Sequence, residues 1–232
     1  MTDKFHILKE YKEALAAAGL VTGDTLDEAA LACTVCDISF DSRAIKPGTL
    51  FICKGAAFKE EFLAAALRAG ACAYVSEQAY ARFDAPCILV SDIRKAMSRI
   101  APLYYNDVQQ RLTLIGITGT KGKSTTAYFE KYILDDFLRA HGQPESAVIS
   151  SIDTYDGVQS FESHITTPET FDLYKHFDNA VSSGISHLTM EVSSQALKYD
   201  RTAGIQYDVG CYLNIGIDHI SDIETSDFDD YF

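Results

Sequence analysis

The segment that most constrains the fold is a glycine-rich turn between an apolar run and an amphipathic stretch. The run at 112–115 is β-type, and it leads into Gly-Ile-Thr-Gly-Thr-Lys-Gly-Lys-Ser-Thr-Thr at 116–126. Phe129, Ile133 and Phe137 then lie on one face of an expected helix. A strand, a glycine-rich turn and a helix in this order predict an α/β fold with a parallel sheet.

The same turn has the composition of a phosphate-binding loop. Glycines let backbone N–H groups surround phosphate oxygens, and the helix N-terminus adds positive potential. Lys123 is expected to contact the β- and γ-phosphates, and Ser124 to offer its hydroxyl to Mg²⁺. The strict Walker pattern is not met, because Ile117 stands where its first glycine should be. An unliganded strand-to-helix turn is the alternative. The predicted ATP site comprises Gly119, Thr120, Lys121, Gly122, Lys123, Ser124 and Thr125.

Strand and helix signals alternate on both sides of this loop. They predict helices at 4–18, 58–69, 92–105 and 167–184, and strands ending at Phe51 and at 71–76, 87–90, 147–150, 187–192 and 207–214. The region from 150 to 167 is expected to be a loop, and Thr167 with Pro168 resembles a helix start. We expect two α/β domains, at 1–108 and 109–232, the second with an incomplete parallel sheet.

Composition narrows the possible partners. A net charge of −13 argues against a nucleic-acid surface, because phosphate backbones are bound mainly by Lys and Arg. No stretch approaches the ~20 apolar residues that span a bilayer, and the first residues do not resemble a signal peptide, so we expect a cytoplasmic protein without membrane insertion. The six cysteines are expected to be buried free thiols.

Five motifs in order resemble the Mur ligase family. Along the chain they are Asp-Ser-Arg-Ala-Ile-Lys-Pro-Gly-Thr-Leu-Phe at 41–51, Gly-Thr-Lys-Gly-Lys-Ser at 119–124, Thr-Thr-Pro-Glu at 166–169, Met-Glu-Val-Ser-Ser at 190–194 and Asn-Ile-Gly-Ile-Asp-His at 214–219. The resemblance is strongest to the branch that adds lysine as the third residue of the peptidoglycan stem peptide. It implies a UDP-binding α/β domain followed by a P-loop-type ATPase domain.

The resemblance also implies a reaction and its partners. ATP would phosphorylate the terminal carboxylate of a UDP-N-acetylmuramoyl dipeptide, and the amine of a free amino acid would attack the resulting acyl phosphate. This agrees with chemistry, because a carboxylate is a poor electrophile until it gains a leaving group. The amino-acid pocket would lie in a third domain outside this sequence, so this chain alone is not expected to turn over.

Site residues follow from the same resemblance. Lys123, Glu191 and His219 would be catalytic, and Ser124, Glu191 and His219 would hold metal ions. Thr166, Thr167, Ser193 and Arg201 would bind the muramoyl peptide, and Phe40 and Ser42 the uridine. Three simpler roles stay open: Thr167 as a helix cap, Ser42 as a turn residue, and Glu191 as a structural carboxylate.

Three readings remain at this point. The first is a ligase of the branch described above. The second is a non-catalytic module that binds the UDP-sugar or a nucleotide. The third is a related ligase such as folylpolyglutamate synthetase, which the segment at 41–43 disfavours because a folate ligase has no use for a uridine-binding domain. An unfinished parallel sheet would also expose an edge and apolar surface, so we expect self-association through that edge.

Overall fold

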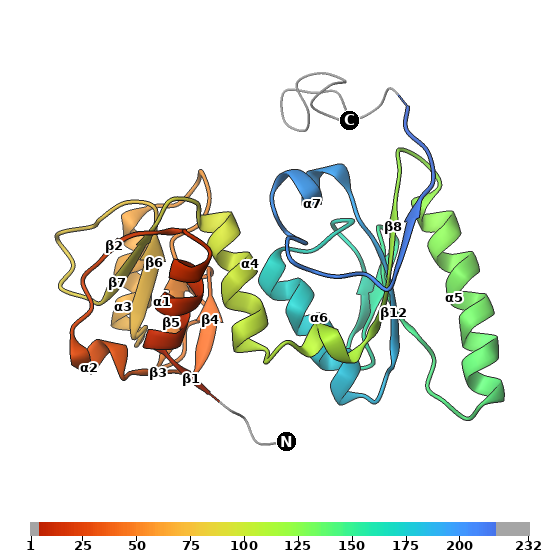
Figure 1. Cartoon of the computed structure of the whole chain (residues 1–232), viewed down its shortest axis with the longest axis horizontal. Coiled ribbons are helices and arrows are strands. Elements are labelled where there is room, and N and C mark those ends of the chain that lie inside the picture. Colours follow the sequence, from red (N-terminus) through yellow and green to blue (C-terminus); the bar gives the residue numbers. More distant parts are fainter. Residues whose placement is uncertain (1–4, 217–232) are drawn as a thin grey trace. The chain divides into compact units, whose positions relative to one another are not determined.

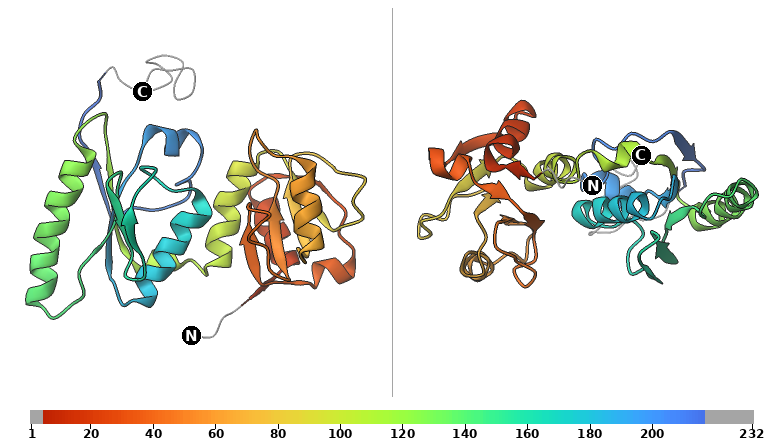
Figure 2. Two further views of the ribbon diagram at one scale, coloured as in Figure 1. Left: turned by 180° about the vertical axis from the view of Figure 1, so that it is seen from behind. Right: turned by 90° about the horizontal axis from the view of Figure 1, so that it is seen from below.

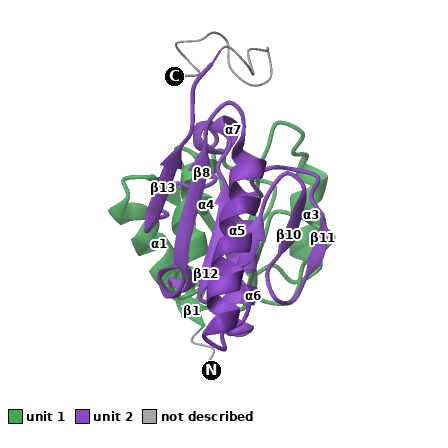
Figure 3. Ribbon diagram, turned by 90° about the vertical axis from the view of Figure 1, so that its right-hand side faces the viewer, with its two compact units in different colours: residues 1–106 green, residues 107–232 purple. Residues whose placement is uncertain are grey.

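A computed structural model describes residues 5–216. The chain divides into two compact units, residues 1–106 and 107–232, coloured separately in Figure 3. This division lies two residues before the boundary expected at 108/109. Each unit contains its own sheet and helices, and each is described here by itself.

Unit 1 is built around a five-stranded sheet in the order β2-β7-β6-β5-β4. Its strands are β2 (Val21–Asp24), β4 (Asp37–Ser39), β5 (Thr49–Ile52), β6 (Ala73–Ser76) and β7 (Cys87–Val90), and β1 (His6–Ile7) pairs with β3 (Thr34–Val35) in a separate ladder. Its helices are α1 (Leu8–Ala17), α2 (Glu28–Leu31), α3 (Glu60–Arg68) and α4 (Ile93–Tyr104). All pairings in the larger sheet are parallel except that of β2 with β7.

Local sequence explains two features of unit 1. Every residue of β5 and β6 is buried, as expected for central parallel strands covered on both faces. Helix α4 begins after Asp92, whose carboxylate accepts hydrogen bonds from the N–H groups of Arg94 and Lys95, at 2.9 and 3.0 Å. This cap satisfies donors that have no partner within the helix.

Unit 2 is a six-stranded sheet in the order β11-β10-β9-β12-β8-β13. Its elements are η1 (Val108–Arg111), β8 (Thr113–Thr118), α5 (Lys123–Ala140), β9 (Ala147–Ile149), β10 (Asp153–Tyr155), β11 (Ser160–Glu162), α6 (Thr170–Ser182), β12 (His187–Glu191), α7 (Ser194–Lys198) and β13 (Val209–Tyr212). Strands β9, β12, β8 and β13 run parallel, and β10 and β11 pair antiparallel. Helix α5 covers one face of this sheet and α6 the other, in both Figure 1 and Figure 2.

Two expectations for unit 2 were wrong. The region from 150 to 167 holds the antiparallel hairpin β10–β11 instead of a loop. Helix α6 begins at Thr170 with Glu169 as its N-cap, and not at Thr167. The Thr167 hydroxyl donates to the backbone oxygen of Glu191, at 2.9 Å, so it is used in tertiary structure and does not cap the helix.

Helix α5 forms where expected, but its aromatic face is not buried. Phe129, Ile133 and Phe137 are 68%, 72% and 58% exposed. The face that packs on β8 and β12 instead contains Ala127, Lys131, Asp135 and Leu138. Two charged residues can be buried here because they bond to each other, with Lys131 Nζ 2.7 Å from Asp135 Oδ2.

The cysteines are free thiols, but only two of them are buried. Cys53 and Cys87 lie in the core of unit 1, whereas Cys36 is exposed and Cys33, Cys72 and Cys211 are half-buried. The expectation of six buried thiols was therefore wrong. Among residues 5–216, no helix combines the length and the apolar character needed to cross a membrane.

Candidate nucleotide and metal site

The expected site residues of unit 2 gather where its parallel strands end. The glycine-rich loop follows β8, Ser151 follows β9, Glu191 is the last residue of β12, and Asn214 follows β13. Carboxyl ends of parallel strands meet at one edge of a sheet, which is where open α/β sheets bind ligands. The sheet topology therefore brings together residues that are far apart in the sequence.

Two glycines give the loop its shape. Gly119 has φ of +142° and Gly122 has φ of +88°, both in the region that favours glycine. A Cβ at Gly119 would also lie 3.1 Å from the backbone of Asn214 and from Leu213 Cβ. The backbone therefore needs glycine at 119 for both its conformation and its close packing.

Asn214 holds the loop from the neighbouring strand. Its side chain accepts a hydrogen bond from the N–H of Lys121, at 3.0 Å, and donates to the Lys121 oxygen, at 2.9 Å. Its backbone oxygen accepts from Thr120 N, at 3.0 Å, and the Thr120 hydroxyl accepts from Gly216 N, at 2.9 Å. The N–H groups of Thr120 and Lys121 are thus directed to Asn214. These contacts have no local signal in the sequence.

Lys123 and the first turn of α5 make the loop electropositive. Lys123 Nζ donates to the Gly119 oxygen, at 2.7 Å, so the ammonium lies over the loop. The N–H groups of Lys123, Ser124 and Thr125 begin the helix and have no acceptor within it. Together with the helix dipole, these donors suit a bound polyphosphate.

A chain of hydrogen bonds through Ser151 joins two of the three expected metal ligands, Ser124 and Glu191. Ser124 Oγ lies 3.0 Å from Ser151 Oγ. Ser151 donates to Oε1 of Glu191 from both its backbone N–H, at 3.0 Å, and its hydroxyl, at 3.2 Å. The structure thus connects Ser124 to the buried Glu191 and adds Ser151, which sequence reasoning missed.

This donor set fits Mg²⁺. Hydroxyl and carboxylate oxygens are ligands that Mg²⁺ accepts, and Mg²⁺ usually keeps waters and phosphate oxygens as its other ligands. Among the described residues, no group of three or more His, Cys, Asp or Glu side chains could hold a metal ion. His219, the third expected ligand, lies outside the described residues.

The Thr166–Thr167 segment contacts the backbone at Glu191. Thr167 is buried. Its hydroxyl donates to the backbone oxygen of Glu191 and accepts a hydrogen bond from the N–H of Ser193, at 3.1 Å. The Ser193 hydroxyl accepts from Ala196 N and caps α7. Thr166 is half-buried beside this contact. Thr166, Thr167 and Ser193 therefore lie together next to the expected metal ligand.

Arg201 is buried and points toward the same segment. Nη1 donates to the Thr167 oxygen, at 3.2 Å, and Nη2 pairs with Glu169, at 2.9 Å. Its Nε is buried without a hydrogen-bond partner in the described part of the chain. The guanidinium thus holds the loop that carries Thr167, and a direct contact with a substrate carboxylate would require part of this arrangement to change.

The expected uridine residues belong to unit 1. Phe40 and Ser42 follow β4 and are both half-buried. Lys54 Nζ lies 4.5 Å from the centre of the Phe40 ring. Asp41, between them, forms an exposed ion pair with Arg43, at 2.8 Å, and hydrogen bonds from Arg43 lower the pKa of this carboxyl. The Phe40 ring, the Ser42 hydroxyl and the cationic side chains of Arg43 and Lys54 thus lie around the turn after β4.

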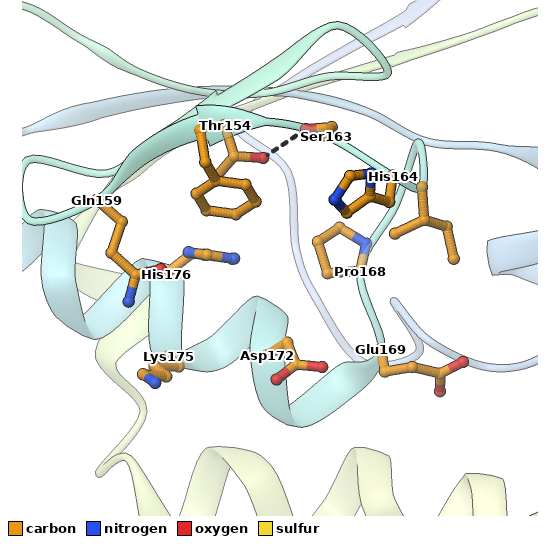
Figure 4. Close-up of a pocket in the computed structure, with 11 residues that line it drawn as sticks. Thr154, Gln159, Ser163, His164, Pro168, Glu169, Asp172, Lys175 and His176 are labelled. Carbon is orange, nitrogen blue, oxygen red and sulfur yellow. Dashed lines mark hydrogen bonds between the residues drawn. The ribbon is translucent and has the colours of Figure 1, made fainter.

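A separate cavity of about 300 Å³ lies between the β10–β11 hairpin and α6. Figure 4 shows His176 and Lys175 on the helix side, Thr154 on β10, and Ser163 just after β11. His176 is hydrogen-bonded to the buried Asp156, with His176 Nδ1 2.7 Å from Asp156 Oδ2. Pro168 and Glu169 reach this cavity, whereas the glycine-rich loop does not line it.

Comparison with known proteins gives consistent results. Residues 117–232 match the Mur ligase middle domain. A UDP-N-acetylmuramoyl-L-alanyl-D-glutamate--L-lysine ligase of Streptococcus agalactiae is 48% identical over 196 residues, covering 84% of this chain and 39% of the relative. The enzyme of the same name from Enterococcus faecalis is 45% identical over 233 residues, covering 99% of this chain and 44% of the relative. The chain therefore spans less than half the length of these relatives.

Solved structures agree with this assignment at the level of the fold. A UDP-N-acetylmuramoyl-L-alanyl-D-glutamate--2,6-diaminopimelate ligase superposes with a TM-score of 0.67 at 24% identity, covering 85% of this chain and 40% of that one. MurF from Acinetobacter baumannii superposes with a TM-score of 0.60 at 18% identity, covering 99% and 45%. The match to the Mur ligase middle domain over residues 117–232, half of the chain, shows that the chain belongs to the Mur ligase family.

Proposed function

We propose that this chain is part of an ATP-dependent ligase that adds L-lysine to UDP-N-acetylmuramoyl-L-alanyl-D-glutamate in peptidoglycan synthesis. The names of the relatives at 45–48% identity support the substrate and the amino acid. The single observation that carries the chemistry is the Ser124–Ser151–Glu191 chain beside the glycine-rich loop. It provides oxygen ligands for a cation next to donors for a polyphosphate.

In this proposal the residues after β8 hold the nucleotide. Lys123 turns from its loop carbonyls to the phosphates, and the first N–H groups of α5 bind phosphate oxygens. Ser124 and Glu191 hold Mg²⁺, with His219 as a further proposed ligand. When bound, ATP and Mg²⁺ supply a transferable phosphoryl group and neutralise its charge. The chain's own groups orient the phosphates and place positive charge beside them.

The dipeptide substrate is assigned to two regions. Thr166 and Ser193 offer hydroxyls for the muramoyl peptide, with Thr167 and Arg201 shaping the same segment. Phe40 and Ser42 contact the uridine, which makes residues 1–108 a UDP-binding domain and residues 109–232 the ATP-binding domain. We also propose that the reaction takes place in the cytoplasm, where ATP is available.

Calorimetry on the chain tests the two binding regions separately. Lys123→Ala should weaken ATP binding at least tenfold and leave binding of the UDP-muramoyl dipeptide within about twofold, because the lost cation belongs to the glycine-rich loop and not to the uridine residues of unit 1. Lys95→Ala is the matched control, since Lys95 also lies in the first turn of a helix, α4. Equal loss of both ligands in Lys123→Ala would overturn the division into two sites.

The ligase activity itself is a proposal for the whole protein. Binding without turnover is expected from this chain, because it spans less than half the length of its relatives. A protein of the relatives' full length that carries this sequence should form ADP with the dipeptide and lysine, and much less with diaminopimelate. Equal rates with both amino acids would contradict the lysine assignment.

We also propose that the exposed face of α5 allows this chain to self-associate. Phe129, Tyr132, Ile133 and Phe137 form it, and each is more than half exposed. Contiguous apolar surface of this kind promotes association in water.

A further inference from the structure

Ser151 lies in a hydrogen-bonded turn that follows β9. The preceding Ser150 is buried, and its hydroxyl accepts hydrogen bonds from the N–H groups of Ile152 and Asp153, at 3.0 and 3.1 Å. Its own N–H donates to the Asp153 oxygen, at 3.0 Å. This turn fixes the backbone on the C-terminal side of Ser151, while the Ser151 side chain itself is exposed.

The contacts of Ser151 link two strands and a helix. It donates twice to Glu191 on β12, and its hydroxyl meets the hydroxyl of Ser124 on α5. A buried carboxylate such as Glu191 is costly unless hydrogen bonds compensate for its lost hydration. Two donors from one residue, one of them backbone, hold the carboxylate in a single orientation.

The two hydrogen bonds also distinguish the carboxylate oxygens. Among the described residues, both Ser151 bonds fall on Oε1 of Glu191. Oε2 is the carboxylate oxygen that Ser151 does not contact. Groups that orient a metal ligand without touching the metal affect affinity strongly, because they remove the cost of arranging the ligand on binding.

We propose that Ser151 is a positioning residue that sets Glu191 against the Ser124 hydroxyl and thereby determines how tightly Mg²⁺ binds with the nucleotide. This inference rests on the proposed function, since it concerns the same cation. A serine that only stabilises the turn after β9 would affect folding but not the Mg²⁺ requirement of nucleotide binding.

The test is a Mg²⁺ titration of nucleotide binding. Binding of a fluorescent ADP analogue to the chain is measured in EDTA and at increasing Mg²⁺ for wild type, Ser151→Ala, Ser151→Thr and Ser160→Ala. Ser151→Ala should raise the Mg²⁺ concentration for half-maximal effect about tenfold, while affinity in EDTA changes less than about twofold. Ser151→Thr keeps the hydroxyl and should resemble wild type. Ser160→Ala, an exposed serine on β11, is the control.

Each outcome separates this inference from the proposed function. An unchanged Mg²⁺ requirement in Ser151→Ala, or an equal loss in EDTA, overturns the role of Ser151. A wild-type chain that shows no Mg²⁺-dependent nucleotide binding overturns the proposed function instead. The alanine variant keeps the backbone bond to Glu191, and thermal melting checks that it folds. If it does not fold, Ser151→Gly replaces it, because glycine also lacks the hydroxyl and keeps the backbone N–H, and an unchanged Mg²⁺ requirement there counts against the inference in the same way.

Discussion

Asp156 shows how a single buried residue can hold part of unit 2 together. It is fully buried at the start of the β10–β11 turn and accepts hydrogen bonds from His176, Asn179 and the N–H groups of Val158 and Gln159. Burial alone would raise the pKa of Asp156, but these donors outweigh it and lower the pKa. The carboxylate thus joins the hairpin to α6 in its charged form.

Replacing this carboxylate should give a pH-dependent loss of stability. Because the folded pKa is lowered, the stabilisation is complete above the unfolded pKa of about 3.9 and is lost as the pH falls through the folded pKa. Asp156→Asn should lower the free energy of unfolding by about 2 kcal/mol at pH 7, and the gap to wild type should narrow below about pH 4. Urea melts measure it, with the exposed Asp136→Asn as control. A gap that is the same at pH 7 and pH 3 contradicts this account.

Gly119 makes a second prediction at the residue scale. Gly119→Ala combines an unfavourable φ with contacts at 3.1 Å, whereas Gly142→Ala has a positive φ but no atom within 4 Å. Gly142→Ala should cost about 1 kcal/mol of stability from backbone strain alone. Gly119→Ala should cost more and also weaken nucleotide binding at least tenfold, because the loop must move. Thermal melts and calorimetry compare the two, and equal nucleotide affinities would show that the loop tolerates the change.

At the scale of the helix, α5 is anchored by a buried polar network and not by its aromatic residues. Lys131 Nζ pairs with Asp135 and donates to the Ser146 oxygen, at 2.8 Å. Asp135 accepts from both the N–H and the hydroxyl of Ser146, each at 2.7 Å. Burial would raise the pKa of Asp135, but these bonds outweigh it and lower the pKa. The network ties α5 to the residue before β9.

Breaking one partner of this network should be costly. Lys131→Ala leaves the Asp135 carboxylate without its cation, and the free energy of unfolding should fall by about 3 kcal/mol. Arg139→Ala removes an exposed ion pair from the same helix and should change it by less than about 0.5 kcal/mol. Urea unfolding of both variants gives the comparison. Similar small losses in the two would mean that the packing of Ala127 and Leu138 anchors the helix instead.

The elements that the sequence predicts well are those with strong periodic signals. The bounds of several elements lie within a few residues of those predicted: strands β5 to β9, strand β12, and helices α4 and α5. Buried strands and capped helices have local signatures in the sequence. The hairpin escaped prediction because its strands have three residues each and β11 is exposed throughout. Periodicity places apolar residues on one face of α5, but it cannot say what covers that face.

The candidate site divides in the same way. The glycine-rich loop has a local signature, so the sequence predicts its ATP-binding residues one by one, and Gly119 and Gly122 adopt positive φ angles there. Ser151 and Asn214 contribute through contacts 40 and 93 residues away in the sequence. Thr167 has the local pattern of a helix cap, but its hydroxyl forms hydrogen bonds with the backbone of Glu191 and Ser193 instead. Only strand pairing brings such residues together.

For the whole molecule, the exposed face of α5 is the feature with the largest expected effect in solution. Four large side chains lie along one side of a helix in a protein whose net charge of −13 otherwise favours solubility. Burying apolar side chains between two copies is favourable by roughly 25 cal/mol per Å² removed from water, and salt weakens the opposing charge repulsion. Association should therefore increase with protein concentration and with ionic strength.

Sedimentation velocity on the chain and two variants tests this expectation. Ile133→Glu places a charge in the centre of the aromatic face and should shift the chain toward monomer by at least tenfold in dissociation constant, since a charge cannot be buried there without a partner. Val158→Glu is the matched control, because Val158 is an apolar residue of similar exposure, 64%, in the β10–β11 turn. It should leave the association unchanged. If wild type sediments as a monomer at high concentration and high salt, the face of α5 does not bind a second copy.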